Sequence, residues 1–415
     1  MHEYKTLSNG IRVVAEKIPY LRSVSIGVWV GNGSRHEGKS ENGISHFIEH
    51  MFFKGTSKRS AEEIAEAIDA VGGQINAFTA REYTCFHTKT LDEHAQIAID
   101  ILSDIIFNSS ITEESMALER KVIGEEINLY EDSPEDLVYD ILYGEVWKGT
   151  SMGRNILGTK ESLNSISRNV MLDYIKNHYT SANMVISVSG NYQTGFFDML
   201  EEYFGGHTLL NTKPQMPEAQ YTPGRVLKTK DIEQVQLVTS FKGIDIYDED
   251  IYSLLVFNNV FGCGMSSRLF QDIREKLGLV YSIGAGHSSY NGTGIFDIDA
   301  GMSPDNLEAV AELISKEIRE IKQNKLTAKE VEKAREQLKG AYILSYESTG
   351  ARMQGAGRSL LIDKPILTQE EMIEKIEAVN QDSVARVIDK IFDTKTLSVA
   401  AVGPVDSIDG LFLDI

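Results

Sequence analysis

The sequence predicts an α+β protein of two similar domains, each with helices packed on a mostly antiparallel β-sheet. Alternating apolar and polar residues in SVSIGVWVG and QVQLVTSFKG are typical of strands. A period of three to four residues in SAEEIAEAIDAVG and DNLEAVAELISKEIREIKQN is typical of helices. No regular strand–helix–strand alternation is evident, which favours antiparallel pairing. A chain of 415 residues is also too long for one hydrophobic core.

A polar, proline-containing stretch near the middle predicts where the two domains meet. The segment NTKPQMPEAQYTPGR (211–225) reads as a linker between an N-terminal domain, 1–210, and a C-terminal domain, 226–415. The halves resemble each other in two places. MVISVSGN (184–191) is similar to LSVAAVGP (397–404), and GRNIL (153–157) is similar to GRSLL (357–361). Because the offsets are nearly constant, we expect an internal duplication.

Composition excludes several classes of protein. The chain is 42% apolar and 25% charged, and no apolar run approaches the roughly 18 residues of a membrane span. The N-terminus predicts a strand, an Asn-Gly turn and a second strand rather than a signal peptide. Two distant cysteines, Cys85 and Cys263, predict buried thiols in a reducing compartment, hence a cytoplasmic protein. The net charge of −20 argues against nucleic acid or anionic membranes as partners.

The segment GISHFIEHMFF predicts a helix with one apolar and one titratable face. It begins near Gly43 and runs past Phe52, and its apolar stripe is made of Ile44, Phe47, Ile48, Met51 and Phe52.

The opposite side of this helix carries the titratable residues. His46 and His50 lie one turn apart, a spacing that suits zinc, with Glu49 beside them to hold a water. The pattern H-x-x-E-H is that of inverted zinc peptidases. The alternative is a solvated polar face. A catalytic zinc site also needs a third protein ligand.

A second helix is predicted within EESMALERKVIGEEINLYEDSPED (113–136), ending at the Asp-Ser-Pro breaker. Its apolar stripe contains two carboxylates, Glu119 and Glu126, whereas Glu125 lies off the stripe. A carboxylate on a buried face costs several kcal/mol unless it is compensated. A zinc site would compensate both, one as a ligand and the other by accepting a hydrogen bond from a ligand imidazole. The alternative is an amphipathic helix of irregular polarity. The stripe residues are Met116, Ile123, Ile127 and Tyr130.

Taken together, these segments resemble the M16 metallopeptidases, which include pitrilysin, insulysin and the mitochondrial processing peptidases. The resemblance covers essentially the whole chain and is strongest to half-length members similar to the processing peptidase β subunit. The family motif is H-x-x-E-H with a glutamate about 76 residues later, and here His50 is followed by Glu126 at that separation. The run GSRHEGKSENGISHFIEHMFFKGT also matches.

The resemblance implies a role for each site residue. His46, His50 and Glu126 are expected to bind one Zn²⁺ per chain, Glu49 to act as general base and Glu119 to support a ligand. GGQINAFTAREYT resembles the family's substrate-binding edge strand, with Asn76, Ala77 and Phe78 as the matching residues. FGCGMSSRLFQDIREKLGLVYS resembles a segment in which an Arg and a Tyr, here Arg274 and Tyr281, hold the substrate carbonyl and the developing oxyanion.

The function implied is a zinc-dependent endopeptidase that hydrolyses unfolded peptides or oligopeptides in a chamber. Chambered family members have four domains of this type, so this two-domain chain is expected to pair into a clam-shell homodimer. The alternative is a non-catalytic assembly subunit of the same fold, like the family's core proteins of a respiratory complex. Such members are expected to lose zinc ligands, which this sequence keeps.

Overall fold

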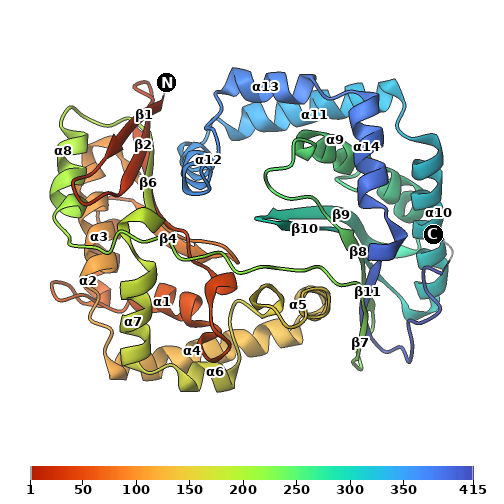
Figure 1. The fold of residues 1–415 in the computed structure, drawn as a ribbon, viewed down its shortest axis with the longest axis horizontal. Coiled ribbons are helices and arrows are strands. Elements are labelled where there is room, and N and C mark those ends of the chain that lie inside the picture. The colour runs from red at the N-terminus through yellow and green to blue at the C-terminus, as the bar shows by residue number, and fades with distance from the viewer. Residues whose placement is uncertain (1, 414) are drawn as a thin grey trace. The chain divides into compact units, whose positions relative to one another are not determined.

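Two β-sheets organise the chain, one in each of two compact units. The computed structural model describes residues 2–413 and 415. It confirms the α+β class, with helices packed on two mostly antiparallel sheets (Figure 1). The first unit comprises Met1–Ile127, Arg154–Pro217 and Leu344–Thr368, and the second comprises Asn128–Gly153, Glu218–Ile343 and Gln369–Ile415.

The first sheet has six strands in the order β1-β2-β6-β3-β5-β4. All neighbours pair antiparallel except β2 and β6, which are parallel. The predicted N-terminal hairpin forms as β1 and β2, and β4 lies at the opposite edge. The strands are β1 (His2–Thr6), β2 (Arg12–Lys17), β3 (Ser23–Val30), β4 (Gln74–Thr79), β5 (Thr84–Leu91) and β6 (Met184–Gly190).

The second sheet repeats the topology of the first without β1. Its order is β7-β11-β8-β10-β9, again with one parallel pair, β7 and β11, and antiparallel pairs elsewhere. Each strand has a counterpart in the first sheet in the same chain order, which supports the predicted duplication. The strands are β7 (Arg225–Thr229), β8 (Val235–Lys242), β9 (Val280–Tyr290), β10 (Thr293–Met302) and β11 (Ser398–Gly403).

Of the two pairs of similar segments in the sequence, only one pair occupies equivalent positions in the structure. MVISVSGN and LSVAAVGP form β6 and β11, which occupy equivalent positions in their sheets. GRNIL lies in a loop, whereas GRSLL lies inside a helix, so this second match is not a structural equivalence. A five-residue string of one Gly, one Arg, one small polar residue and two apolar residues fits either conformation.

Helices from the first half of the sequence cover one face of the first sheet. The core between them joins Val24, Ile26, Val28 and Val30 of β3 to apolar side chains of the helices. The main helices of this half are α1 (Ile44–Phe52), α2 (Ala61–Asp69), α3 (Ala95–Phe107), α4 (Glu113–Asp132), α6 (Lys160–Ser165), α7 (Arg168–His178) and α8 (Phe196–Leu200).

The other face of the first sheet is covered by a helix from the far end of the sequence. This helix is α12 (Thr349–Leu361), which lies beside the sheet in Figure 1. Its Met353 and Leu361 belong to one buried cluster with Trp29, Cys85 and Val185. The alternation of β3 explains this, because Trp29 points away from the valines that face the main core.

The second unit is built in the same way. One face of its sheet packs on α9 (Ile251–Phe261), α10 (Leu307–Asn324) and α14 (Gln381–Ile391), and α11 (Ala328–Ser345) and α13 (Gln369–Glu377) complete its helices. Its other face is covered by α5 (Pro134–Val146), a helix from the first half of the sequence.

The sequence predicts contiguous domains, 1–210 and 226–415, whereas the compact units each contain a helix from the other half. The predicted linker is free of helix and strand up to Gly224, and the unit boundary at Pro217 falls within it. No helix in the described residues is both long and apolar enough to cross a bilayer.

Candidate metal centre

Helix α1 forms where the sequence predicts it, with its apolar side fully inside the core. All five residues of the predicted stripe are buried. The helix begins after Gly43, whose φ of 91° suits glycine. The buried carboxylate of Glu37 accepts hydrogen bonds from the backbone N–H groups of Gly43 and Ser45, at 2.8 and 2.9 Å. Glu37 therefore satisfies donors that the first turn of α1 would leave unpaired.

Helix α4 carries the two predicted carboxylates and ends at the predicted Asp-Ser-Pro breaker. It ends at Asp132 because Ser133 caps the next helix, α5, and Pro134 is the first residue of α5. Glu119 is buried and Glu126 half-buried. Tyr130 is 39% exposed, so its predicted place in the buried stripe is wrong; the stripe ends at Ile127.

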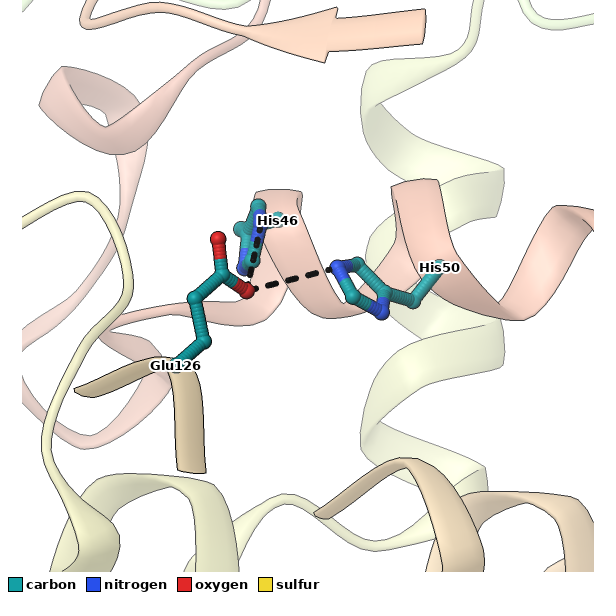
Figure 2. Close-up of side chains that lie close together, drawn as sticks. All are labelled: His46, His50 and Glu126. Atoms are coloured by element: carbon teal, nitrogen blue, oxygen red, sulfur yellow. Dashed lines mark ion pairs between the residues drawn. The ribbon is translucent and has the colours of Figure 1, made fainter. Parts of the chain in front are cut away.

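Two histidines and one glutamate from these helices converge on one point. Nε2 of His46 and Nε2 of His50 each lie 3.7 Å from Oε2 of Glu126. One nitrogen or oxygen atom of each residue lies within 4.8 Å of the others. Figure 2 shows the imidazoles projecting from α1 toward the carboxylate, which comes from α4. The structure thus brings Glu126 to two histidines that lie 80 and 76 positions before it in the sequence.

The chemistry and spacing of these groups fit a zinc ion. Two imidazole nitrogens and one carboxylate oxygen form a donor set of catalytic zinc sites, which keep a fourth position for water or substrate. Neighbouring donors around a tetrahedral zinc lie about 3.4 Å apart, a few tenths of an ångström below the separations here. Burial lowers the pKa of His46 to about 3, with the neighbouring His50 adding to this effect. His46 is therefore neutral near pH 7, as a metal ligand must be.

Glu119 holds His50 in place and is itself held by a residue that the sequence analysis missed. Oε2 of Glu119 lies 3.0 Å from Nδ1 of His50, the arrangement predicted for a carboxylate that supports a ligand imidazole. Oε1 of the same carboxylate lies 2.8 Å from Nζ of Lys54. The position of Lys54, four residues after His50, is a weak signal that could have indicated it.

Glu49 lies beside the cluster, and its carboxylate binds a hydroxyl of the sheet. Oγ1 of Thr79, at the end of β4, donates a hydrogen bond of 2.5 Å to Oε2 of Glu49. Burial raises the pKa of Glu49, while the Thr79 hydroxyl and His50 act in the opposite direction. The charge of Glu126 also raises it, which shows that Glu49 and the cluster share one electrostatic environment. Nothing in the sequence around Thr79 indicates this contact.

The three predicted substrate-binding residues lie on β4, which is an edge strand as predicted. Asn76 is exposed and accepts a hydrogen bond from the backbone N–H of Ala77 through its own side-chain oxygen. Ala77 packs on the main core of the first unit. Phe78 packs edge-on against Trp29, with ring centroids 5.8 Å apart. A role for these residues in binding substrate stays a prediction.

Arg274 and Tyr281 lie together in the second unit. The Arg274 guanidinium carbon is 4.7 Å from the ring centroid of Phe270 and 5.9 Å from that of Tyr281. Arg274 belongs to a π-helical segment, Phe270–Glu275, and Tyr281 is on β9. The Tyr281 side chain is 71% exposed. A phenol and a guanidinium are thus available side by side at the surface of this unit.

Comparison with known protein families identifies the group to which this chain belongs. The family model described as insulinase, peptidase family M16, matches residues 12–160. The model described as peptidase M16 inactive domain matches residues 165–338. The chain belongs to peptidase family M16. The first match contains all the residues of the candidate metal centre.

Individual relatives agree with this assignment. The uncharacterized zinc protease YmxG of Bacillus subtilis is 42% identical over 399 residues, covering 96% of this chain and 97% of the relative. An uncharacterized zinc protease of Rickettsia felis is 36% identical, with coverage of 96% and 97%. These names support zinc use within the family.

Two solved structures share the fold. The structure of a peptidase M16 inactive domain from Pseudomonas fluorescens has a TM-score of 0.91 at 16% identity, covering 99% of this chain and all of that one. A protease from Helicobacter pylori has a TM-score of 0.89 at 20% identity, with coverage of 97% and 99%.

Proposed function

We propose that this chain is a zinc-dependent endopeptidase that hydrolyses unfolded peptides or oligopeptides, with Glu49 as the general base. One observation carries the proposal: in a chain of family M16, two imidazoles and a carboxylate converge with a further carboxylate beside them. His46, His50 and Glu126 would hold one zinc ion per chain. When bound there, zinc would lower the pKa of a water molecule and polarise the scissile carbonyl.

The side chains around this centre would transfer the proton, orient a ligand, bind the peptide and stabilise the oxyanion. Glu49 takes a proton from the attacking water and passes it to the leaving amine. Glu119 orients His50 through the hydrogen bond to Nδ1. Peptide backbone pairs with the open edge of β4, which gives binding with little dependence on sequence. Arg274 and Tyr281 stabilise the oxyanion that develops on the scissile carbonyl.

The assembly that we propose is a homodimer in which two chains enclose a chamber, in the cytoplasm. Such a chamber would admit unfolded peptides and exclude folded proteins. The test is to compare the cleavage rates of a folded protein and of its denatured form at equal concentration. We expect only the denatured form to be cleaved. Equal cleavage of both forms would contradict an enclosed site.

A comparison of three glutamate variants tests the catalytic proposal. Glu49→Gln should retain zinc, as measured by elemental analysis, and lose nearly all cleavage of a quenched peptide. Glu126→Gln should lose zinc. Glu125→Gln, an exposed neighbour on the same helix, is the matched control and should change neither. A fully active Glu49→Gln variant would refute the role of the base, and a zinc-loaded wild type that cleaves no peptide would favour a non-catalytic subunit.

A further inference from the structure

The outer edge of β4 presents backbone groups to an incoming chain at Ala77 and Thr79. Among the described strands, β4 pairs only with β5. The Ala80 N–H donates to the Tyr83 carbonyl in the turn toward β5, so the N–H of the preceding Thr79 points the other way. Ala77, two residues earlier, has the same orientation, and its N–H is bound by the side chain of Asn76 at the edge. An added strand would therefore bond to the backbone of Thr79, and at Ala77 it would displace the Asn76 side chain from the N–H.

The side chain of Thr79 points to the face of the sheet that carries α1. Alternation along the strand places Thr79 on the same side as Ala77, which packs on the main core. From there the Thr79 hydroxyl reaches Oε2 of Glu49. One residue thus offers its backbone to the edge and its hydroxyl to the proposed base.

The hydroxyl of Thr84, which lies next to that of Thr79, does not compete with Glu49 for the Thr79 proton. Thr84 lies across from Thr79 on β5, with the two hydroxyl oxygens 3.5 Å apart. The Thr84 hydroxyl donates to the carbonyl of Asn32 at 2.9 Å. Because each hydroxyl has one proton and the Glu49 carboxylate only accepts, the direction of the contact is fixed. Thr79 donates and Glu49 accepts.

We propose that Thr79 is a positioning residue that links a peptide bound at the edge of β4 to the orientation of Glu49. The inference rests on the proposed function of Glu49 as general base. A base works only within hydrogen-bond reach of the proton it abstracts, and small misplacements of reacting groups are costly. Since the same residue fixes both the peptide and the base, removing the hydroxyl should slow catalysis and leave backbone pairing intact.

Thr79→Val tests this inference because it keeps the β-branched shape and removes only the hydroxyl. We expect kcat to fall about 10- to 100-fold, with KM within about twofold and zinc content unchanged. Thr79→Ser, which restores the hydroxyl, should recover most of kcat. The matched control is Thr88→Val in β5, because the Thr88 hydroxyl is buried and has no hydrogen-bond partner among the described residues. That control should keep the wild-type kcat.

A double variant distinguishes positioning from a general loss of structure. If Thr79 acts through Glu49, adding Thr79→Val to Glu49→Gln should cause no further loss of residual single-turnover rate. The inference is overturned by a wild-type kcat in Thr79→Val, by a loss confined to KM, or by a full additional loss in the double variant. A zinc-loaded wild type that cleaves no peptide would overturn the proposed function together with this inference. An active wild type matched by Thr79→Val would overturn this inference alone.

Discussion

Replacing Lys54 by methionine should weaken metal binding although Lys54 is not a predicted ligand. Lys54 pairs with Oε1 of Glu119, and Oε2 of that carboxylate holds Nδ1 of His50. The Glu119 side chain is 5% exposed and that of Lys54 is 38% exposed. Removing the ammonium therefore leaves a buried carboxylate oxygen without its cation, and the hold on the ligand imidazole loosens.

The structure sets the size of the expected effect. A carboxylate that supports a ligand histidine is worth about 10- to 100-fold in metal affinity, so Glu119→Gln should fall in this range. Lys54→Met should lie near its lower end, about tenfold or 1.4 kcal/mol. Water can reach the partly exposed position of Lys54 and replace part of the lost hydrogen bond.

Zinc affinity measured by competition with a chromogenic chelator is the appropriate assay. Lys58→Met is the control, because Lys58 is exposed and lies 3.9 Å from Asp104 rather than near Glu119. If Lys54 acts through Glu119, adding Lys54→Met to Glu119→Gln should change the affinity less than twofold. Wild-type affinity in Lys54→Met, or full additivity in the double variant, would refute the reasoning.

Three further predictions concern packing, oxyanion stabilisation and the metal. A Cβ at Gly357 would lie 2.2 Å from Nε1 of Trp29, whereas one at Gly355 on the same helix meets nothing within 4 Å. Gly357→Ala should therefore destabilise the protein by about 1–3 kcal/mol. The control, Gly355→Ala, should stabilise it by about 0.5–1 kcal/mol. Equal melting temperatures for the two variants would contradict the packing of α12. Arg274→Met and Tyr281→Phe should each lower kcat at least tenfold with unchanged zinc content, and wild-type turnover would remove them from the mechanism. Chelation should abolish cleavage of a quenched peptide and added zinc should restore it; activity that survives complete removal of the metal would exclude a metal mechanism.

Local sequence patterns predicted the elements that carry the candidate site. The apolar stripe of α1 is continuous, so its period alone fixed which side of the helix His46 and His50 occupy. The carboxylates of α4 were recognisable because charge on a buried stripe must be compensated. The distance between the two helices was not recoverable from either pattern. That contact came from the family resemblance, and the structure agrees with it in geometry.

The features that the sequence did not reveal depend on long-range packing. Trp29 and Met353 belong to one buried cluster although they lie far apart in the chain. Nothing in the local sequence indicates that α5 packs on the second sheet or that α12 packs on the first. Lys54 and Thr79 are ordinary surface-type residues in the sequence. Their importance follows only from the atoms that they meet, Glu119 and Glu49.

The duplicated topology suggests how the two halves came to differ in chemistry. By strand order, β9 of the second sheet is the counterpart of β4 in the first, and both are edge strands. In the first copy, the edge strand ends at Thr79, which contacts the proposed base. In the second copy, Tyr281 is the second residue of the edge strand, and Arg274 lies beside it. Under the proposed mechanism, the edge strand of the first copy would position the base and that of the second copy would stabilise the oxyanion, so a second copy without an H-x-x-E-H motif would still be needed for turnover.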